Sequence, residues 1–427
     1  MQRRQASGEV SRPGDASVAL ALLHAIFGRE YARRFAVALW DGTREEARER
    51  EEFTLCVNEP GALRAAFSPP ADLNAGRAFA AGLIDVRGDL ESAVDALYRA
   101  GETTTPARAL DVIRLTRRLP KPDLPQLREA SMHGAQHSLA RDRQAIGFHY
   151  DLPVEFFASF LDSSLTYSCA YYADGVDSLE AAQRAKIDYV LRKLRLRAGE
   201  RLLDIGCGWG GLVVRAAELG ATVLGITLSA GQCGEARRRI AAAGLEGRAR
   251  VELRDYRELG GERFEKIVSV GMCEHVGGSR IDEYFRAAFD ALEPGGLFLN
   301  HGIANQAGGS GKASGFIERF IFPDGELLSI SRTLRSAEAQ GFEVRDVENL
   351  REHYARTLRA WVANLERGRE AAIAAASEPV YRAWRLYMAG SAQGFRSGRM
   401  GLFQSLLARR DAAGAARVPA TRSDLYR

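Results

Sequence analysis

The most informative part of the chain is LLDIGCGWGG, residues 202–211. It has the pattern of an apolar strand with an acid, Asp204, near its end, followed by a glycine-rich turn that opens a helix. Glycines let a ligand approach the backbone closely, and the first turn of a helix presents N–H groups without partners inside the helix. This stretch therefore predicts a binding site for a nucleotide-like ligand where a strand meets a helix.

Two cofactors bind loops of this kind, and the position of the acid separates them. Gly206, Gly208 and Gly211 satisfy the dinucleotide fingerprint, which also expects an acidic residue about 20 positions later, at the end of the second strand. That region, LGITL at residues 224–228, contains no acid. The acid precedes the first glycine instead, at Asp204, as in S-adenosylmethionine-dependent methyltransferases. The pattern favours S-adenosylmethionine, with a dinucleotide site and a purely structural turn as the alternatives.

The pattern continues on both sides of this loop. Short apolar runs typical of strands alternate with helix-length segments or loops, which predicts an α/β fold with a parallel sheet and helices on both faces. His301 ends the last run, where the carboxyl edge of such a sheet forms the ligand crevice. The runs cover residues 201–205, 223–227, 251–253, 266–270 and 297–301.

The first hundred residues have a different organisation. Helical patterns alternate there with strand-like runs such as FTLCV at residues 53–57, which predicts a small α+β domain over residues 1–102. Residues 103–143 contain clustered prolines with basic residues between them, and we expect a mobile linker. The large domain is then predicted to cover residues 144–427 and to end in a basic, helical C-terminal tail.

Composition indicates the class of protein. The 427 residues are 46% hydrophobic and 27% charged, with a mean hydropathy of -0.22, which argues against disorder and coiled coil. The apolar stretch at residues 16–28 is shorter than the ~18 residues that a membrane-spanning helix needs. The five cysteines are dispersed without metal-ligand spacing, so we predict neither a disulfide framework nor a metal site. A cytoplasmic location is expected.

Basic residues are concentrated near the C-terminus. The formal net charge is +4, yet residues 382–427 contain nine arginines against Asp411 and Asp424. A basic end on a near-neutral body suits an anionic surface, either a phospholipid membrane or nucleic acid. A solvated tail is the alternative, because arginine outnumbers lysine along the whole chain.

Six motifs, in their order and spacing, resemble cyclopropane-fatty-acyl-phospholipid synthases, which are methyltransferases with a Rossmann-like class I fold. The match runs from about Gly147 to about Arg399. Residues 82–91, GLIDVRGDLE, resemble the smaller lipid-associated domain of longer bacterial members. The motifs are HYDL at 149–152, YSCAY at 167–171, the loop at 204–211, TLS with a later glutamine at 227–232, SVGM followed by EHVG at 269–277, and FIFP at 320–323.

The resemblance implies a set of residues around S-adenosylmethionine. Thr227 and Gln232 offer neutral polar groups to the ribose, and Tyr256 offers a flat apolar face to the adenine beside the acceptor of Asp255. A turn residue at Asp255 and a core aromatic at Tyr256 are the alternatives. The implied cofactor residues are Tyr167, Ser168, Asp204, Gly206, Cys207, Gly208, Trp209, Gly210, Thr227, Leu228, Ser229, Gln232, Asp255 and Tyr256.

The family's reaction sets further requirements for the site. The π bond of a cis-unsaturated acyl chain attacks the sulfonium methyl group, and that methyl group loses a proton as the ring closes. The site therefore needs apolar walls, aromatic faces that stabilise a cation, and one base. The aromatic candidates, each equally compatible with core packing, are Tyr171, Tyr172, Phe316, Phe320 and Phe322.

The resemblance also implies a bound bicarbonate ion as the base. His301 and Tyr354 are the expected donors to it, and Glu274 orients the ion or shares a proton. A second assignment makes Glu274 or His275 the base directly, and Cys169 is also compatible with a buried apolar role. The positions that match the bicarbonate site are Cys169, Glu274, His301, Ile303 and Tyr354.

The expected function is transfer of a methylene group to the cis double bond of phospholipid acyl chains, with peripheral attachment to the inner face of an anionic membrane. One alternative ends the same methyl transfer as a methyl or methylene branch, and another is a non-catalytic lipid-binding protein. A nucleic-acid substrate is not expected, because the Asn/Asp-Pro-Pro-aromatic string of many base-methylating enzymes is absent. The family resemblance also suggests a homodimer.

Overall fold

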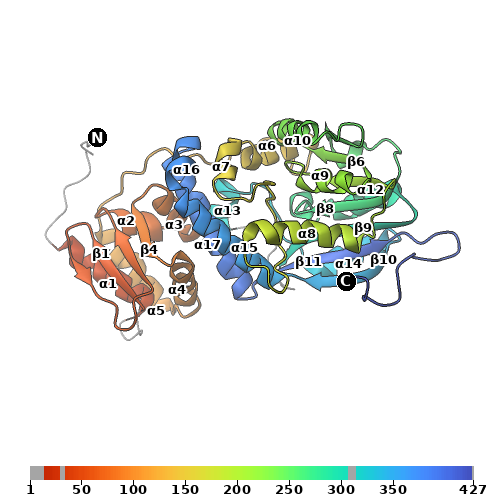
Figure 1. The fold of residues 1–427 in the computed structure, drawn as a ribbon. Helices are drawn as coiled ribbons and strands as arrows, with labels where there is room; N and C mark the ends of the chain where they lie inside the picture. Colours follow the sequence, from red (N-terminus) through yellow and green to blue (C-terminus); the bar gives the residue numbers. More distant parts are fainter. Residues whose placement is uncertain (1–13, 29–33, 306–313, 426–427) are drawn as a thin grey trace. The chain divides into compact units, whose positions relative to one another are not determined.

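Two compact units make up the chain in the computed structural model, which describes residues 14–28, 34–305 and 314–425 (Figure 1). The smaller unit contains two later segments of the chain in addition to the N-terminal one. It comprises Met1–Glu129, Ser314–Ile321 and Ala376–Gln393. The larger unit, which contains the glycine-rich loop, comprises Ala130–Ala313, Phe322–Ala375 and Gly394–Arg427.

A seven-stranded sheet forms the centre of the larger unit. The strand order is β10-β11-β9-β8-β5-β6-β7. Strands β5 to β9 run parallel, and β11 and β10 are added antiparallel beside β9. The predicted α/β fold with a mainly parallel sheet is confirmed. The strands are β5 (Arg201–Ile205), β6 (Thr222–Thr227), β7 (Ala249–Leu253), β8 (Phe264–Val270), β9 (Leu292–Asn305), β10 (Glu343–Asn349) and β11 (Met400–Ala408).

The parallel strands supply side chains to two hydrophobic cores, one on each face of the sheet. Leu202 and Val223 belong to one core, whereas their neighbours Leu203 and Leu224 belong to the other. Successive side chains of a strand point to opposite faces, so a sheet covered on both faces needs continuous apolar runs. The helices of the first core are α8 (Leu179–Lys193), α9 (Gly211–Glu218) and α10 (Ala230–Ala242), and those of the second are α11 (Cys273–Val276), α12 (Ile281–Ala291) and α14 (Ile330–Ala339).

Further helices of the larger unit precede the sheet, lie between β7 and β8, or follow β10. They are α6 (Leu139–Tyr150), α7 (Val154–Ala158), the short 3₁₀ helix η1 (Tyr256–Glu258), α15 (Arg351–Arg367) and α16 (Arg369–Ala375). Among the helices that the structure describes, none combines the length and the apolarity needed to cross a membrane.

The smaller unit is built around a four-stranded sheet with the order β2-β1-β3-β4. Strands β1 and β3 are parallel, and the other two pairings are antiparallel. Its strands are β1 (Phe35–Leu39), β2 (Arg44–Glu45), β3 (Phe53–Val57) and β4 (Ile84–Gly88). Its helices are α1 (Asp15–Phe27), α2 (Ala62–Phe67), α3 (Ala71–Ala80), α4 (Leu90–Glu102), α5 (Pro106–Arg118), α13 (Gly315–Phe320) and most of α17 (Glu378–Arg396).

The linker predicted over residues 103–143 is helical at both ends, which corrects that prediction. Helix α5 occupies residues 106–118 and packs against α1, and α6 begins at Leu139. Pro106 lies in the first turn of α5, where a backbone N–H would have no acceptor inside the helix, so the proline costs no hydrogen bond. The hydroxyl of Thr105 caps the helix by accepting from the N–H of Arg108. The proline was therefore part of a helix start and not a break.

The C-terminal tail is not helical beyond Arg396, which corrects a second prediction. Residues 400–408 form β11, an internal strand of the large sheet. Many of the arginines in this region have acidic partners: Arg382 and Arg385 bind Asp85 in the smaller unit. In the larger unit the pairs are Arg410 with Glu343, Arg417 with Asp411 and Arg422 with Asp346.

Candidate active site

The turn between β5 and α9 has backbone conformations that favour glycine. The φ angles of Gly206, Gly208 and Gly210 are 82°, 54° and 85°, in the left-handed region that side chains rarely adopt. The N–H groups of Gly206 and Cys207 both donate to the carbonyl of Ile226. The turn is thus fixed to the end of β6, and most of its residues line a cavity.

This cavity encloses about 950 Å³, partly open to solvent, at the carboxyl edge of the parallel strands. It brings together twelve of the fourteen cofactor residues implied by the sequence. The other two, Gly210 and Ser229, do not line it. Ser229 instead caps α10 by accepting from the N–H of Gln232 at 3.2 Å, and its hydroxyl donates to Asp151 at 2.8 Å. Lining residues that sequence reasoning missed include Ile146, Tyr150, Lys186, Arg254 and Met272.

Two polar positions of the wall are set by local contacts. The hydroxyl of Thr227, at the end of β6, donates to Oε1 of Gln232 at 2.8 Å. This pair presents neutral polar groups to the cavity, as expected for a ribose edge. Asp204, in β5, is buried, and burial raises its pKa to about 7, opposed by the positive charge of Lys186.

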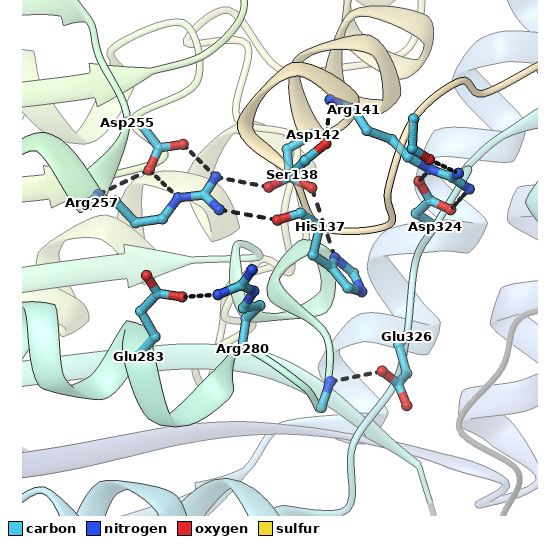
Figure 2. Close-up of polar contacts among 12 residues, drawn as sticks. His137, Ser138, Arg141, Asp142, Asp255, Arg257, Arg280, Glu283, Asp324 and Glu326 are labelled. Atoms are coloured by element: carbon cyan, nitrogen blue, oxygen red, sulfur yellow. Dashed lines mark hydrogen bonds and ion pairs between the residues drawn. The ribbon is translucent and has the colours of Figure 1, made fainter.

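At the Tyr256 end of the cavity, an arginine that the sequence did not single out holds Asp255 (Figure 2). Nε and Nη2 of Arg257 bind the two carboxylate oxygens of Asp255 at 2.7 and 2.8 Å, and Nη2 also binds Asp142 at 2.8 Å. The hydrogen bonds to Asp255 raise the pKa of Arg257, so the guanidinium stays charged. Asp255 also caps η1, so its turn role and its place in the cavity wall coexist.

Two chain segments beside this end are joined by a bidentate ion pair. Arg141, in α6, binds both carboxylate oxygens of Asp324 at 2.6 and 2.7 Å, and Glu326 accepts from the N–H of Gly278 at 2.7 Å (Figure 2). A second cavity of about 410 Å³ lies here and shares Asp255, Tyr256, Met272 and His275 with the first. Helix α6, which contributes Ile146 and Tyr150 to the first cavity, is thereby anchored.

Glu274 and Ile303 are in direct contact. Glu274 lies in α11, and its Oε1 accepts from the backbone N–H of Ile303 at 2.7 Å. Its Oε2 accepts from the thiol of Cys273 at 3.4 Å. Burial raises the pKa of Glu274. The carboxyl group is therefore oriented and has an increased affinity for a proton.

His301, in β9, is buried and has one ring nitrogen available as a donor. Its Nδ1 lies 3.2 Å from Nε2 of Gln404 in β11, and its Nε2 has no hydrogen-bond partner among the described residues. Burial lowers the pKa of His301, so the ring is neutral. With Gln404 donating to Nδ1, the ring proton lies on Nε2. The Nε2–H of His301 can therefore donate a hydrogen bond to an acceptor atom of a bound ligand.

The sequence also matches the family model for mycolic acid cyclopropane synthetase over residues 137–405. The chain belongs to this family. A probable fatty acid methyltransferase of Pseudomonas putida is 39% identical over 395 residues, covering 91% of this chain and 95% of that protein. Tuberculostearic acid methyltransferase UfaA1 of Mycobacterium tuberculosis is 37% identical over 285 residues, 64% of this chain and 66% of that protein. The structure of mycolic acid cyclopropane synthase CmaA1 complexed with SAH and CTAB has a TM-score of 0.59 and 37% identity, covering 62% of this chain and 97% of that one.

Membership of the cyclopropane synthetase family confirms the resemblance seen in the sequence. The chain is an S-adenosylmethionine-dependent methyltransferase with a Rossmann-like fold. The family supports methylene or methyl transfer to lipid acyl chains, which ends in a cyclopropane ring or a methyl branch.

The remaining two residues that the sequence resemblance assigned to a bicarbonate site, Cys169 and Tyr354, both approach Leu350. The thiol of Cys169 lies 3.9 Å from the carbonyl of Leu350, and that carbonyl accepts from the N–H of Tyr354. Burial raises the pKa of Cys169, so its thiol stays protonated and is a poor nucleophile. None of the five residues of the pattern lines the 950 Å³ cavity, but the charge of Lys186 acts on both Cys169 and His301.

The aromatic candidates separate into three groups. Tyr171 and Tyr172 stack with His353 and are part of the packing around α15. Phe316 and Phe320 pack on each other within α13 of the smaller unit. The ring centroid of Phe322 lies 3.8 Å from that of His149 and 5.4 Å from that of His275. Of these two histidines, His275 lines the cavity.

His275 is the alternative base that the sequence resemblance left open. Its Nε2 lies 3.3 Å from the hydroxyl of Tyr150, and both residues line the cavity. Burial lowers the pKa of His275 to about 4, so the neutral ring is a weak proton acceptor. The raised pKa of Glu274 favours Glu274 over His275 as the proton-accepting side chain.

Proposed function

We propose that this protein adds a methylene group from S-adenosylmethionine across the cis double bond of phospholipid acyl chains and forms cyclopropane fatty acids. The supporting observation is a cofactor cavity whose wall includes His275 and Gly271, with the buried Glu274 next to His275 in the chain and the buried His301 accepting through its carbonyl from the N–H of Gly271. Methyl transfer to an alkene leaves a cation, and ring closure then requires that the new methyl group lose a proton. A buried proton acceptor near the cofactor cavity meets that requirement.

A bicarbonate ion fits the polar groups of Glu274 and His301. The unpartnered Nε2 of His301 is a buried donor, and Glu274 can share a proton with an anion because burial raises its pKa. The residues that would hold the ion are Cys169, Glu274, His301, Ile303 and Tyr354. Bound there, bicarbonate would supply a base stronger than a neutral histidine of depressed pKa. Without an added ion, Glu274 is the best proton acceptor in this group.

A methyl or methylene branch is the second candidate product, favoured by the 37% identity to a tuberculostearic acid methyltransferase. The test is incubation with S-adenosylmethionine and vesicles of cis-monounsaturated phospholipid, followed by mass spectrometry of the acyl chains before and after mild hydrogenation. Gain of one CH₂ without a reducible double bond supports cyclopropanation. The same gain with a reducible double bond indicates a branch, and no gain would overturn both.

The same proposal requires contact with a membrane, and the surface that fits is on α5. Leu110 is 68% exposed and Ile113 43%. They share a helical face with Arg114 and Arg117 because residues three, four and seven apart lie on one side of a helix. An apolar pair flanked by arginines suits an anionic lipid surface. The paired arginines of the C-terminal tail are less suited to this role.

Cosedimentation with vesicles tests this membrane contact. We expect binding to phosphatidylglycerol vesicles that weakens as salt rises, with little binding to phosphatidylcholine. The double variant Leu110→Ser with Ile113→Ser should bind several-fold more weakly, whereas Arg410→Gln with Arg417→Gln in the tail should bind nearly as wild type. Equal binding by wild type and the α5 variant would contradict the assignment.

A further inference from the structure

We infer that His353 and Thr357, one turn apart on α15, are positioning residues that hold residues 165–173 in place for turnover. Neither residue belongs to the six motifs that resemble the family. The inference rests on the place of this segment in the site and not on the identity of the lipid. Its failure and the failure of the proposed lipid chemistry can therefore be told apart.

The segment of residues 165–173 contributes to both parts of the site. All of it lies in the described part of the chain, and it forms neither helix nor strand. Tyr167 and Ser168 line the cofactor cavity, and the next residue is the buried Cys169. Backbone N–H and C=O groups in a protein interior need hydrogen-bond partners. A segment without regular secondary structure has to find these partners on other elements.

Helix α8 supplies some of these partners. Nε2 of Gln183 donates to the carbonyl of Thr166 at 3.1 Å and to that of Ser168 at 2.8 Å. The carbonyl of Ala182 accepts from the N–H of Tyr171 at 3.0 Å. These bonds fix the start of the segment and one N–H group near its end.

Helix α15 binds the two N–H groups on either side of that of Tyr171. The N–H of Ala170 donates to Oγ1 of Thr357 at 3.1 Å. The N–H of Tyr172 donates to Nδ1 of His353 at 3.0 Å. The two acceptors are linked, because the hydroxyl of Thr357 donates to the carbonyl of His353 at 2.7 Å. The fully buried Thr357 hydroxyl thus has both its donor and its acceptor partner fixed.

The ring of His353 is oriented as an acceptor. It stacks on the ring of Tyr171, with centroids 4.8 Å apart and an interplanar angle of 15°. Burial lowers the pKa of His353, and the charges of Glu348 and Glu352 oppose this shift only in part. The ring is therefore neutral, and because Nδ1 accepts from a backbone N–H, the ring proton lies on Nε2.

Loss of these two acceptors should displace Cys169 more than the cofactor wall. Cys169 directly precedes the first of the two bound N–H groups, whereas Ser168 keeps separate partners in Gln183 and Lys186. Neither of the two α15 side chains lines the 950 Å³ cavity. Because misplacement by about 1 Å can lower a rate about 10²-fold, we expect a larger effect on kcat than on the KM for S-adenosylmethionine.

Hydrogen–deuterium exchange followed by mass spectrometry tests the segment without any substrate. His353→Phe keeps an aromatic ring for the stack but removes the acceptor. His353→Asn places an amide oxygen where Nδ1 lies, since both atoms are bonded to Cγ. Peptides covering residues 165–173 should exchange about five-fold faster in His353→Phe, as expected for one lost hydrogen bond, and within about two-fold of the wild type in His353→Asn.

Thr357→Val and Thr357→Ser form a second pair, which also decides the question if His353→Phe does not fold. Valine resembles threonine in shape but lacks the hydroxyl, and serine keeps it. Turnover is measured with vesicles of cis-monounsaturated phospholipid. We expect kcat to fall about ten-fold in His353→Phe and Thr357→Val and to stay within about three-fold in the two conservative variants, with the KM for S-adenosylmethionine nearly constant in all four.

Three results would overturn the inference. Unchanged exchange of residues 165–173 in both His353→Phe and Thr357→Val would show that the segment does not depend on these acceptors. Faster exchange throughout the larger unit would show a general structural role. Faster exchange confined to the segment, with kcat unchanged, would show that its position does not matter for turnover. A wild type without turnover would instead count against the proposed lipid substrate, and the exchange rates would still decide whether α15 holds the segment.

Discussion

Replacing Glu274 with glutamine separates the proton chemistry of this side chain from its packing. The amide oxygen can still accept from the N–H of Ile303, a bond of 2.7 Å in the wild type, but an amide neither accepts a proton nor becomes negatively charged. Loss of a positioned proton acceptor lowers rates by about 10²- to 10⁴-fold. We expect kcat to fall by a factor in this range and the affinity for S-adenosylhomocysteine to stay nearly constant.

The stability of the same variant should change in the opposite direction. Burial raises the pKa of Glu274 above its value in the unfolded chain. A group of this kind contributes its full stability below the unfolded pKa, and this contribution is lost as pH rises through the folded pKa. Glutamine does not ionise, so the Glu274→Gln variant does not lose this stability as pH rises. Urea unfolding should therefore show the variant to be as stable as the wild type or more stable at pH 8, with this advantage disappearing toward pH 4.

Turnover is measured with vesicles of cis-monounsaturated phospholipid, and cofactor affinity by calorimetry. Glu326→Gln is the matched control, because the side chain of Glu326 also accepts one backbone N–H, that of Gly278 at 2.7 Å. Only its backbone, which the substitution keeps, contacts Glu274. The control should keep turnover within about three-fold of the wild type, as expected when no proton-transfer group is lost. Similar turnover in Glu274→Gln would refute the role assigned to Glu274.

Three further variants test the cavity. Gly210→Ala places a Cβ at φ 85° and 3.0 Å from a neighbouring Cβ, so thermal unfolding should show a loss of about 1–2 kcal/mol. Arg257→Met releases Asp255, and calorimetry should show weaker binding of 5′-methylthioadenosine; unchanged affinity would contradict the role of this pair. Ser229→Ala removes a helix cap and should cost about 1 kcal/mol of stability, while affinity for S-adenosylhomocysteine stays constant; a large loss of affinity would return Ser229 to the binding site.

The parallel part of the sheet could be predicted because each of its strands is a short local signal. Strands β5, β6, β8 and β9 each contain a short apolar run, since both faces of the sheet are covered there, whereas the edge strand β7 alternates apolar and charged residues. Strand β11 carries Gln404 and Ser405 in its interior and follows a long helix, so the sequence suggested a helical tail. Gln404 is buried because it pairs with His301, about a hundred residues earlier. Local patterning does not reveal a pairing of that kind.

The residues of the cofactor cavity also divide into those that local sequence predicts and those that only tertiary packing brings together. Thr227 and Gln232 lie five residues apart across a strand end and a helix start, so their proximity follows from local structure. Arg257 meets Asp142 across 115 residues, and Lys186 has the appearance of an ordinary lysine in an amphipathic helix. Only tertiary packing brings Lys186, in α8, into the wall of the cofactor cavity and Asp142, in α6, to Arg257 beside it. Glu274 and His301 were identified through the family resemblance and not through any charge pattern.

The most direct test of the central claim uses S-adenosylmethionine with a CD₃ group and cis-monounsaturated phospholipid vesicles. Ring closure by proton loss from the transferred methyl group predicts products that gain one carbon with two deuterium atoms and contain no reducible double bond. Products that keep all three deuterium atoms beside a reducible double bond would show that the proton leaves another carbon, and would contradict cyclopropane formation.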